Sequence, residues 1–231
     1  MSQGIVSQGI VRVIVATGTR QEAATLRSPA LVVIAGGGDA AGLRAKLEAA
    51  VAGAVEGVAG IISFGMAGAL ADHLAIGDWV VGDRLTGEVE RDCDPAWRDA
   101  LLAKLPRARA GTIYADGRMI DTVTEKRVLG ARHRALAVDM ESHVAAAIAA
   151  ANGLPFAIAR CISDGPDHAL PHAITVAMRP DGGLDLPAML RSLARRPGQL
   201  TDIARTTAGF ARAMRALKRG AALLGARMAF D

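Results

Sequence analysis

The sequence has 231 residues, of which 51% are apolar, and this length allows one large domain with a substantial buried core. Only 3% of the residues are aromatic, which argues against a nucleic-acid surface built on stacked aromatic side chains. The formal net charge of +4 is uneven, because residues 191–231 carry nine Lys and Arg against two acids, whereas residues 1–190 carry 18 against 21. A basic C-terminal segment on a slightly acidic body does not fit a general nucleic-acid binder.

Short apolar and β-branched runs alternate with Ala-rich runs of helical period along most of the chain. Strands are predicted over residues 9–16, 30–35, 60–64, 78–85, 136–139 and 156–162. Helices are predicted over residues 20–27, 39–54, 95–105, 122–132 and 141–151. This alternation predicts an α/β fold of three layers, α/β/α, with helices on both faces of a central mixed sheet. The carboxyl ends of the strands then share one edge, where open α/β sheets bind ligands.

Residues 186–231 are predicted to be a basic helical extension of a single domain that spans residues 1–231. A short helix is predicted over 186–193 and a longer one over 199–224. The apolar positions of the longer helix fall on one stripe: Leu200, Ile203, Thr207, Phe210, Met214, Leu217 and Ala221. Arginines lie mostly on the opposite side: Arg205, Arg212, Arg215 and Arg219. Such a helix either packs on the domain or on a partner subunit, or lies on a membrane whose anionic headgroups suit its basic face.

Neither the cysteines nor the apolar runs indicate a secreted or membrane-spanning protein. Cys93 and Cys161 form no disulfide framework and no metal-binding spacing, so we expect reduced thiols and no metal site. No charge-free apolar run approaches the length of about 20 residues that spans a bilayer. The N-terminus lacks a basic region ahead of an apolar one. We therefore expect a cytoplasmic protein.

Two glycine-rich segments follow predicted strands. Residues 36–38 precede a helix, but the Gly-x-Gly-x-x-Gly spacing of dinucleotide-binding proteins is not met, so we interpret them as a tight turn. Residues 63–69 are predicted to form a loop of small residues. Such a loop lets backbone N–H groups approach a ligand closely.

Carboxylates follow two of the predicted strands. Asp139 and Glu141 lie at the end of one strand, and Asp164 follows Ser163 at the end of the next. Helix capping by Asp139 and a first-turn position for Glu141 would explain two of these acids without any function. Alternatively, the two strand ends bring Glu141 and Asp164 to one rim, where two carboxylates take separate acid and electrostatic roles.

Four segments carry a resemblance to a known family: residues 61–70, 76–81, 137–142 and 160–164. In this order and spacing they resemble the superfamily of purine nucleoside phosphorylases and methylthioadenosine/adenosylhomocysteine nucleosidases. Residues 138–143 and 190–200 are similar to its hopanoid-associated phosphorylase branch. That resemblance implies cleavage of the N-glycosidic bond of adenosylhopane with release of adenine.

The resemblance also implies a role for each candidate site residue. Asp164, supported by Ser163, matches the acid that protonates purine N7. Glu141 matches the carboxylate that holds the ribose hydroxyls and stabilises an oxocarbenium-like transition state, and Glu22 matches the acid that activates water in the nucleosidases. Bond cleavage at a ribosyl carbon needs such leaving-group protonation and negative charge near the cation. The other candidates for substrate binding are Met140, Ile120, Met119, Met66, Ala67 and Gly68.

The nucleophile stays open between phosphate and water. Hexameric phosphorylases bind phosphate with an Arg before the glycine-rich segment and a Ser within it, whereas Ser63 and Met66 occupy these positions here. Ser63, Gly65 and Arg20 are the candidates for a phosphate or water site, with inorganic phosphate as a candidate co-substrate and no other cofactor. Glu22 favours water.

The predicted function is therefore release of adenine from an adenosyl compound, adenosylhopane in the first place, by phosphorolysis or hydrolysis. One alternative is a soluble methylthioadenosine/adenosylhomocysteine nucleosidase, and another is a non-catalytic nucleoside-binding module. Residues 199–224 are the candidate contact with the inner face of the membrane, and no nucleic-acid partner is expected. The resemblance implies a homo-oligomer. His168 and His172 are expected to lie on a mobile loop.

Overall fold

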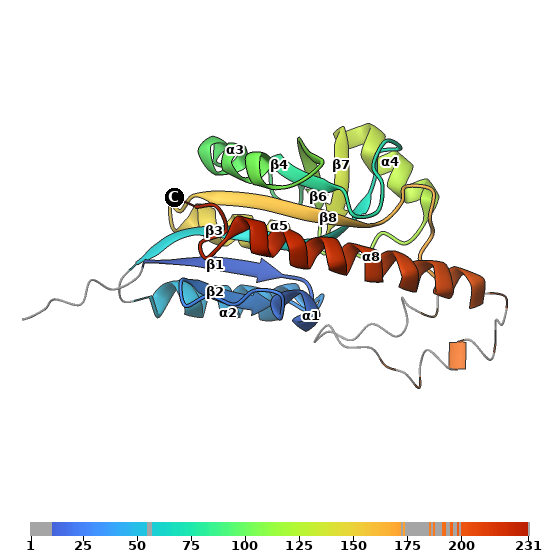
Figure 1. The fold of residues 1–231 in the computed structure, drawn as a ribbon, viewed down its shortest axis with the longest axis horizontal. Helices are drawn as coiled ribbons and strands as arrows, with labels where there is room; N and C mark the ends of the chain where they lie inside the picture. The colour runs from blue at the N-terminus through green and yellow to red at the C-terminus, as the bar shows by residue number, and fades with distance from the viewer. Residues whose placement is uncertain are drawn as a thin grey trace, which may run out of the picture.

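The computed structural model describes residues 11–54, 57–171 and 200–230, with isolated positions at 173, 185, 187, 191, 192, 195 and 198. Within these ranges a mixed sheet has helices on both sides (Figure 1), which confirms the predicted fold class. The strands are β1 (Arg12–Thr17), β2 (Leu31–Ala35), β3 (Val58–Ala69), β4 (Trp79–Gly87), β5 (Arg91–Asp92), β6 (Ala108–Ala115), β7 (Ala135–Asp139) and β8 (Phe156–Asp164). The helices are α1 (Arg20–Ala23), α2 (Ala40–Ala52), α3 (Pro95–Lys104), α4 (Val123–His133), α5 (Ser142–Ala151) and α8 (Leu200–Leu224). The helix predicted over 186–193 falls largely outside the described residues, and His172 lies wholly outside them.

The sheet is partly closed on itself. Its strand order is β2-β1-β3-β7-β6-β4-β5, and β8 pairs with both β3 and β4. Consequently β3, β8, β4, β6 and β7 form a ring in which each strand pairs with two others of the ring. Since β8 runs parallel to β3, its last residue, Asp164, lies beside Gly68.

The core has two apolar layers, one on each face of the sheet. Ile14 and Ala16 of β1 pack in one layer with α2 and α5, whereas Val13 and Val15 pack in the other with α3 and α8. Successive side chains of a strand point to opposite faces, so a strand covered on both sides needs a continuous apolar run. The alternation of strands and helices in the sequence therefore leads directly to this layered core.

Two predicted elements differ from the structure, and two strands, β5 and β6, were not predicted. Residues 63–69 are not a loop but the second half of β3, where small residues allow pairing with both β7 and β8. β6 was not predicted, because it opens on alternating Ala and Arg rather than on a β-branched run. The helix predicted over residues 20–27 ends at Ala23, and the Thr25 hydroxyl donates to the Glu22 carbonyl at 2.6 Å just beyond it.

α8 packs on the sheet through a face that is rich in small residues and coincides only in part with the predicted stripe. Its buried positions are Gly209, Ala213, Ala216, Leu217, Gly220, Ala221 and Leu224. The predicted stripe is correct at Leu217 and Ala221 but wrong at Thr207, which is exposed. A Cβ on Gly220 would lie 2.8 Å from Trp79 Cη2, so the helix approaches the sheet too closely for larger side chains. No described helix is both long and apolar enough to cross a membrane.

Candidate active site

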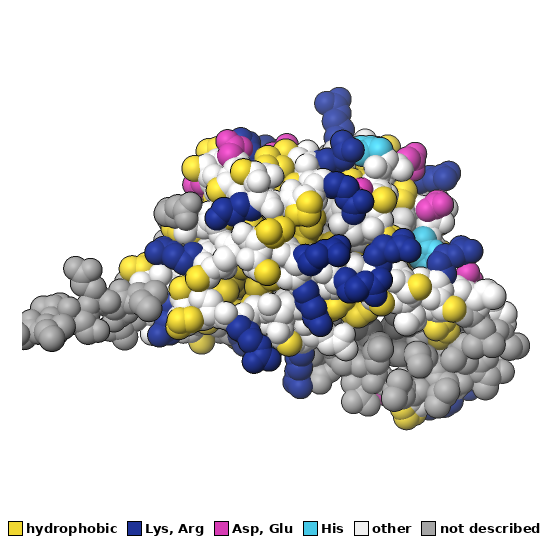
Figure 2. All heavy atoms as spheres, in the orientation of Figure 1, with side chains coloured by type: hydrophobic (Ala, Val, Ile, Leu, Met, Phe, Trp, Pro, Cys, Tyr) yellow, Lys and Arg dark blue, Asp and Glu magenta, His cyan; other side chains and the backbone are white. Residues whose placement is uncertain are grey.

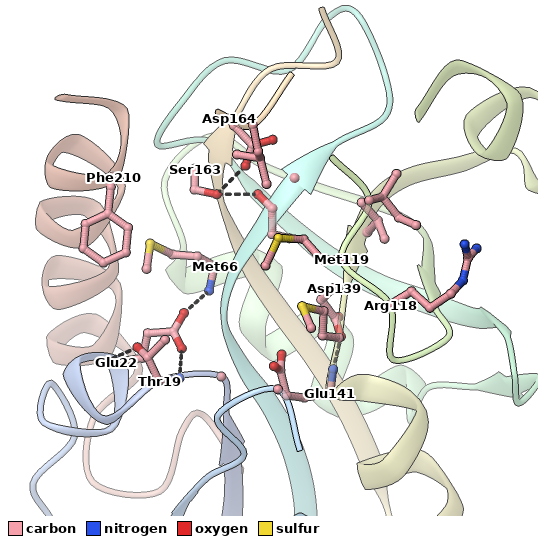
Figure 3. Close-up of a pocket in the computed structure, with 18 of the residues that line it drawn as sticks. Thr19, Glu22, Met66, Arg118, Met119, Asp139, Glu141, Ser163, Asp164 and Phe210 are labelled. Carbon is pink, nitrogen blue, oxygen red and sulfur yellow. Dashed lines mark hydrogen bonds between the residues drawn. The ribbon is translucent and has the colours of Figure 1, made fainter. Parts of the chain in front are cut away.

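A pocket of about 220 Å³ opens where β1, β3, β7 and β8 end (Figure 3). Ten of the predicted site residues line it: Glu22, Met66, Ala67, Gly68, Met119, Ile120, Met140, Glu141, Ser163 and Asp164. These residues come from five separate stretches of the sequence. The structure thus brings together, in one cavity, the acids that follow different strands.

Glu22 is held by a backbone N–H group on each carboxylate oxygen. The Thr19 N–H donates to Oε2 at 2.6 Å, and the Met66 N–H donates to Oε1 at 2.7 Å. Thr19 Oγ1 in turn accepts from the Glu22 N–H at 3.2 Å, which completes a capping box at the start of α1. Burial raises the pKa of Glu22, although Arg160 and the two N–H groups oppose the shift. A raised pKa makes the carboxylate form a stronger base, which suits it to take a proton from water near neutral pH.

Asp139 and Glu141 have different surroundings although they lie two residues apart. Asp139 Oδ1 accepts from the N–H groups of Glu141 and Ser142, at 2.9 and 2.7 Å, and so caps α5. Glu141 occupies the N-cap position, but its side chain makes no capping hydrogen bond and lines the pocket instead. Capping therefore accounts for Asp139 and not for Glu141.

A buried arginine, absent from the predicted site, joins the carboxylates. Arg160 is 0% exposed, and its Nε lies 3.0 Å from Asp139 Oδ2 while its Nη2 lies 3.4 Å from Glu141 Oε2. Nη2 also donates to Ser63 Oγ at 2.5 Å. Burial lowers the pKa of Arg160, but Asp139, Glu141 and Glu22 more than offset this effect, so that the pKa is raised.

The site carries more buried negative than positive charge, because one guanidinium faces three carboxyl groups. Burial raises the pKa of Glu141 to about 7; Arg160 opposes the shift, and Asp139 and Glu22 add to it. Such an excess of negative charge stabilises a cation that develops in the pocket. It also disfavours a second anion there.

Asp164 lies across the pocket from Glu141 (Figure 3). Ser163 Oγ donates to Asp164 Oδ1 at 2.7 Å, and the buried Lys126 of α4 pairs with Oδ2. A Cβ on Gly68 would lie 3.1 Å from Asp164 Oδ2. Gly68 therefore lets the carboxyl group stand close to β3.

The three candidates for a phosphate or water site do not line the pocket. Ser63 is fully buried, and its Oγ accepts from Arg160 and from Ser142 Oγ, the latter at 2.9 Å. A Cβ on Gly65 would lie 2.8 Å from Arg160 Nη1, so the space beside this residue is filled. Arg20 is exposed on α1. Because β3 continues through residues 63–69, Ser63 and Gly65 lie within the sheet rather than at its edge.

Other walls of the pocket were not predicted. They are formed by Gly18, Thr19, Gly37, Gly38, Arg118, Val138, Asp139, Leu170, Thr206 and Phe210. Gly37 and Gly38 have φ angles of 72° and 79°, in agreement with the predicted tight turn. The ring nitrogen Nε2 of His168 lies 2.8 Å from Thr206 Oγ1, which ties the predicted loop to α8. The regular helical pattern around Lys126, Thr206 and Phe210 gave no signal that could have singled these residues out.

Comparisons with known proteins agree with this architecture. The model of the phosphorylase superfamily matches residues 9–195. A putative 5′-methylthioadenosine/S-adenosylhomocysteine nucleosidase from Borrelia burgdorferi, bound to adenine, is 14% identical with a TM-score of 0.61, and the match covers 90% of this chain and 98% of that one.

Two further structures are similar. The 5′-methylthioadenosine/S-adenosylhomocysteine nucleosidase from S. pneumoniae, with a transition-state inhibitor, is 16% identical with a TM-score of 0.59, covering 93% of this chain and 100% of that one. The futalosine hydrolase of Helicobacter pylori is 15% identical with a TM-score of 0.57, covering 89% and 97%. No curated protein matches the chain. At these identities the likeness concerns the fold.

Proposed function

We propose, from the premise that this chain belongs to the phosphorylase superfamily, that it hydrolyses the N-glycosidic bond of an adenosyl compound and releases adenine. The observation that carries the proposal is the division of buried acids between two sides of one pocket. Glu22 and Glu141 lie on one side, and Asp164 with Ser163 lies on the other. Three acids so placed suit protonation of a leaving base, stabilisation of a ribosyl cation and activation of a nucleophile.

Each acid takes one part of the reaction in this proposal. Asp164, aligned by Ser163, donates a proton to purine N7, so that the base leaves without a full negative charge. Glu141, with Met140 against the sugar, binds the ribose hydroxyls and stabilises the cationic transition state. Glu22 takes a proton from the attacking water. The similar nucleosidase from Borrelia burgdorferi is bound to adenine, which supports adenine as the leaving group. Met119 and Ile120 line the pocket and would lie beside the base.

Water fits the site better than phosphate does. Among the described residues that line the pocket, Arg118 is the cationic one, and it is already paired with Asp116 and Glu125 at 2.8 and 2.9 Å. Arg160 is buried among three carboxyl groups. Within the described part of the chain, a phosphate dianion that approaches Glu22 and Glu141 would therefore meet no cation beyond the already paired Arg160. We propose hydrolysis without a cofactor, and treat phosphorolysis as the outcome to exclude.

The finer proposal is that the adenosyl compound is a lipid, adenosylhopane. The resemblance of residues 138–143 and 190–200 to the hopanoid-associated branch supports it. So does the apolar wall of the pocket that Met66 of β3 and Phe210 of α8 form. The competing substrates are soluble thio-nucleosides, which the names of the similar structures favour. The same pocket accommodates an adenosyl group in both cases.

We also propose that the enzyme works in the cytoplasm as a homo-oligomer and meets the inner membrane through α8. Figure 2 shows basic side chains gathered over this helix, and the exposed ones include Arg205, Arg212, Arg215, Lys218 and Arg219. Because the small residues on its other side pack on the sheet, charge rather than an inserted apolar face would make the contact.

One experiment tests the function directly. The full chain is incubated with 5′-methylthioadenosine and, separately, with a short-chain adenosylhopane analogue in detergent, each with and without inorganic phosphate, and adenine and the sugar product are identified. We expect adenine and a free sugar at a rate that phosphate does not change, and faster turnover of the lipid analogue. A sugar 1-phosphate would replace hydrolysis by phosphorolysis. Tight binding of both compounds without any adenine release would support a non-catalytic binding module instead.

A further inference from the structure

A buried lysine lies directly behind Asp164. Lys126 is 0% exposed, and its Nζ donates to Asp164 Oδ2, to the Gly165 carbonyl at 2.9 Å and to the His168 carbonyl at 2.8 Å. An ammonium group has three N–H donors, so all three are used. A charge buried this deeply persists only when it is paired and fully hydrogen-bonded.

The lysine restricts how Asp164 can carry a proton. Because Lys126 donates to Oδ2, a proton bound to Asp164 is directed to Oδ1, the oxygen that Ser163 Oγ contacts at 2.7 Å. When that proton leaves, the carboxylate that remains is stabilised by the ammonium on one oxygen and by the hydroxyl on the other.

We propose that Lys126 is a positioning residue for the acid of this reaction, an inference that rests on the proposed function. As the bond between C1′ and N9 breaks, its electron pair goes to the purine and the proton on Asp164 moves to N7. Asp164 becomes a carboxylate paired with Lys126, which keeps its own proton throughout. Water adds to C1′ and gives up a proton to Glu22, which completes the balance of atoms and charge.

Other charged or titratable groups surround the two cavities that Asp164 lines, and they are Glu22, Asp72, Arg118, Asp139, Glu141, Asp167, His168, Arg205 and Arg212. All of them are shared by the native protein and a Lys126 variant. The ratio of the native rate to the variant rate therefore isolates the effect of the lysine, provided that the fold is retained.

The test compares two leaving groups in Lys126→Met, which keeps the chain length and removes the charge. With 5′-methylthioadenosine, whose purine needs a proton, we expect kcat to fall about 100-fold or more. With 4-nitrophenyl riboside, whose leaving group needs none, we expect a change within about threefold. Lys126→Arg, which keeps the charge, should retain more of the native kcat with 5′-methylthioadenosine than Lys126→Met does.

The outcomes separate the two proposals. An equal loss on both substrates would overturn the role of Lys126 and leave it a purely structural residue. Unchanged rates in Lys126→Met would do the same. If Lys126→Met does not fold, the two substrates are compared in Lys126→Gln, to which the same criteria apply. A folded native chain that releases no adenine from any adenosyl compound would sink the proposed function itself, and the role of Lys126 with it.

Discussion

Glu22 accepts a hydrogen bond of 2.7 Å from the backbone N–H of Met66, a residue 44 positions further along the chain. This bond joins the short helix after β1 to the middle of β3 and fixes the carboxyl group against the pocket. A backbone donor and a buried carboxyl group, rather than a cation, therefore stand at this side of the pocket, which favours the proposed use of water over phosphate.

Replacing Glu22 tests the proposed activation of water. Glu22→Gln can still accept from the Met66 N–H, but it cannot take a proton, so kcat for adenine release should fall by about 10²–10⁴-fold. Affinity for adenine, measured by calorimetry, should stay nearly unchanged. Glu48→Gln, at an exposed position of α2, is the matched control and should behave as the native protein. Full activity of Glu22→Gln would remove Glu22 from the mechanism.

The activity should depend on pH through Glu141. Burial raises the pKa of Glu141 to about 7, and the proposed role requires the carboxylate. We therefore expect kcat/KM for 5′-methylthioadenosine to rise with pH up to about 7 and then level off. Glu141→Gln should lower kcat/KM by about 10²–10³-fold, as the loss of one group that stabilises a charged transition state does. A rate independent of pH between 5 and 8 would speak against an acid with this raised pKa.

The same buried acid should make the fold less stable as pH rises. The pKa of Glu141 is raised from 4.5 to about 7, so between these values the folded protein binds more protons than the unfolded chain does. Stability against urea should therefore fall from pH 5 to pH 7.5, and part of this fall should vanish in Glu141→Gln. Glu22, whose pKa is also raised, contributes with the same sign. An equally steep fall in Glu141→Gln would contradict the assignment.

The contact between α8 and the sheet can be tested at Gly220. Replacement of a helical glycine by alanine ordinarily stabilises a helix by about 1 kcal/mol. At Gly220 the new methyl group would meet the Trp79 ring, so we expect Gly220→Ala to lose about 1–3 kcal/mol of unfolding free energy. Ala222→Gly, at an exposed position of α8, should lose only the usual helical preference, about 0.5–1 kcal/mol. A stabilised Gly220→Ala would show that α8 is free to move away from the sheet.

The proposed membrane contact should be electrostatic. The protein should bind vesicles that contain anionic lipid, release them when salt is raised to about 0.5 M, and ignore vesicles of neutral lipid. Arg215→Glu combined with Arg219→Glu, both at exposed positions of α8, should abolish the binding while leaving turnover of 5′-methylthioadenosine unchanged. Binding that resists salt would instead require an apolar insertion, which the packing of Ala213 and Leu217 on the sheet does not leave available.

The sequence was informative where local pattern decides the structure. Two-sided burial of strands such as β1 makes their apolar runs visible, and acids at the ends of such runs, Glu141 and Asp164, stand out against them. The family resemblance then supplied roles that periodicity alone does not contain. Ten predicted site residues consequently lie around one pocket.

The site residues that the sequence did not reveal have partners that are distant along the chain and meet them only in the folded protein. Arg160 lies in the middle of an apolar strand, and only the approach of Ser63, Asp139 and Glu141 from other elements gives it partners. Lys126 belongs to a helix whose pattern is unremarkable, and it meets Asp164 across 38 residues of chain. The prediction for α8 included the exposed Thr207 and missed the buried Gly209, Ala213, Ala216 and Gly220, because a hydrophobic pattern selects large side chains, whereas a close helix–sheet contact selects Gly and Ala.

Arg160 makes the acids of this site interdependent. Asp139 and Glu141 both form ion pairs with the Arg160 guanidinium, and Glu22 interacts with it electrostatically. Substitutions at these positions should therefore combine non-additively in double-mutant cycles. If the enzyme is the hydrolase proposed above, its conversion to phosphorolysis is then not a matter of placing one new arginine at Ser63. In a redesigned enzyme some of the buried carboxylates would first have to be replaced by neutral side chains. That replacement would also weaken the proposed stabilisation of the ribosyl cation. The choice of nucleophile is in this sense a property of the whole cluster.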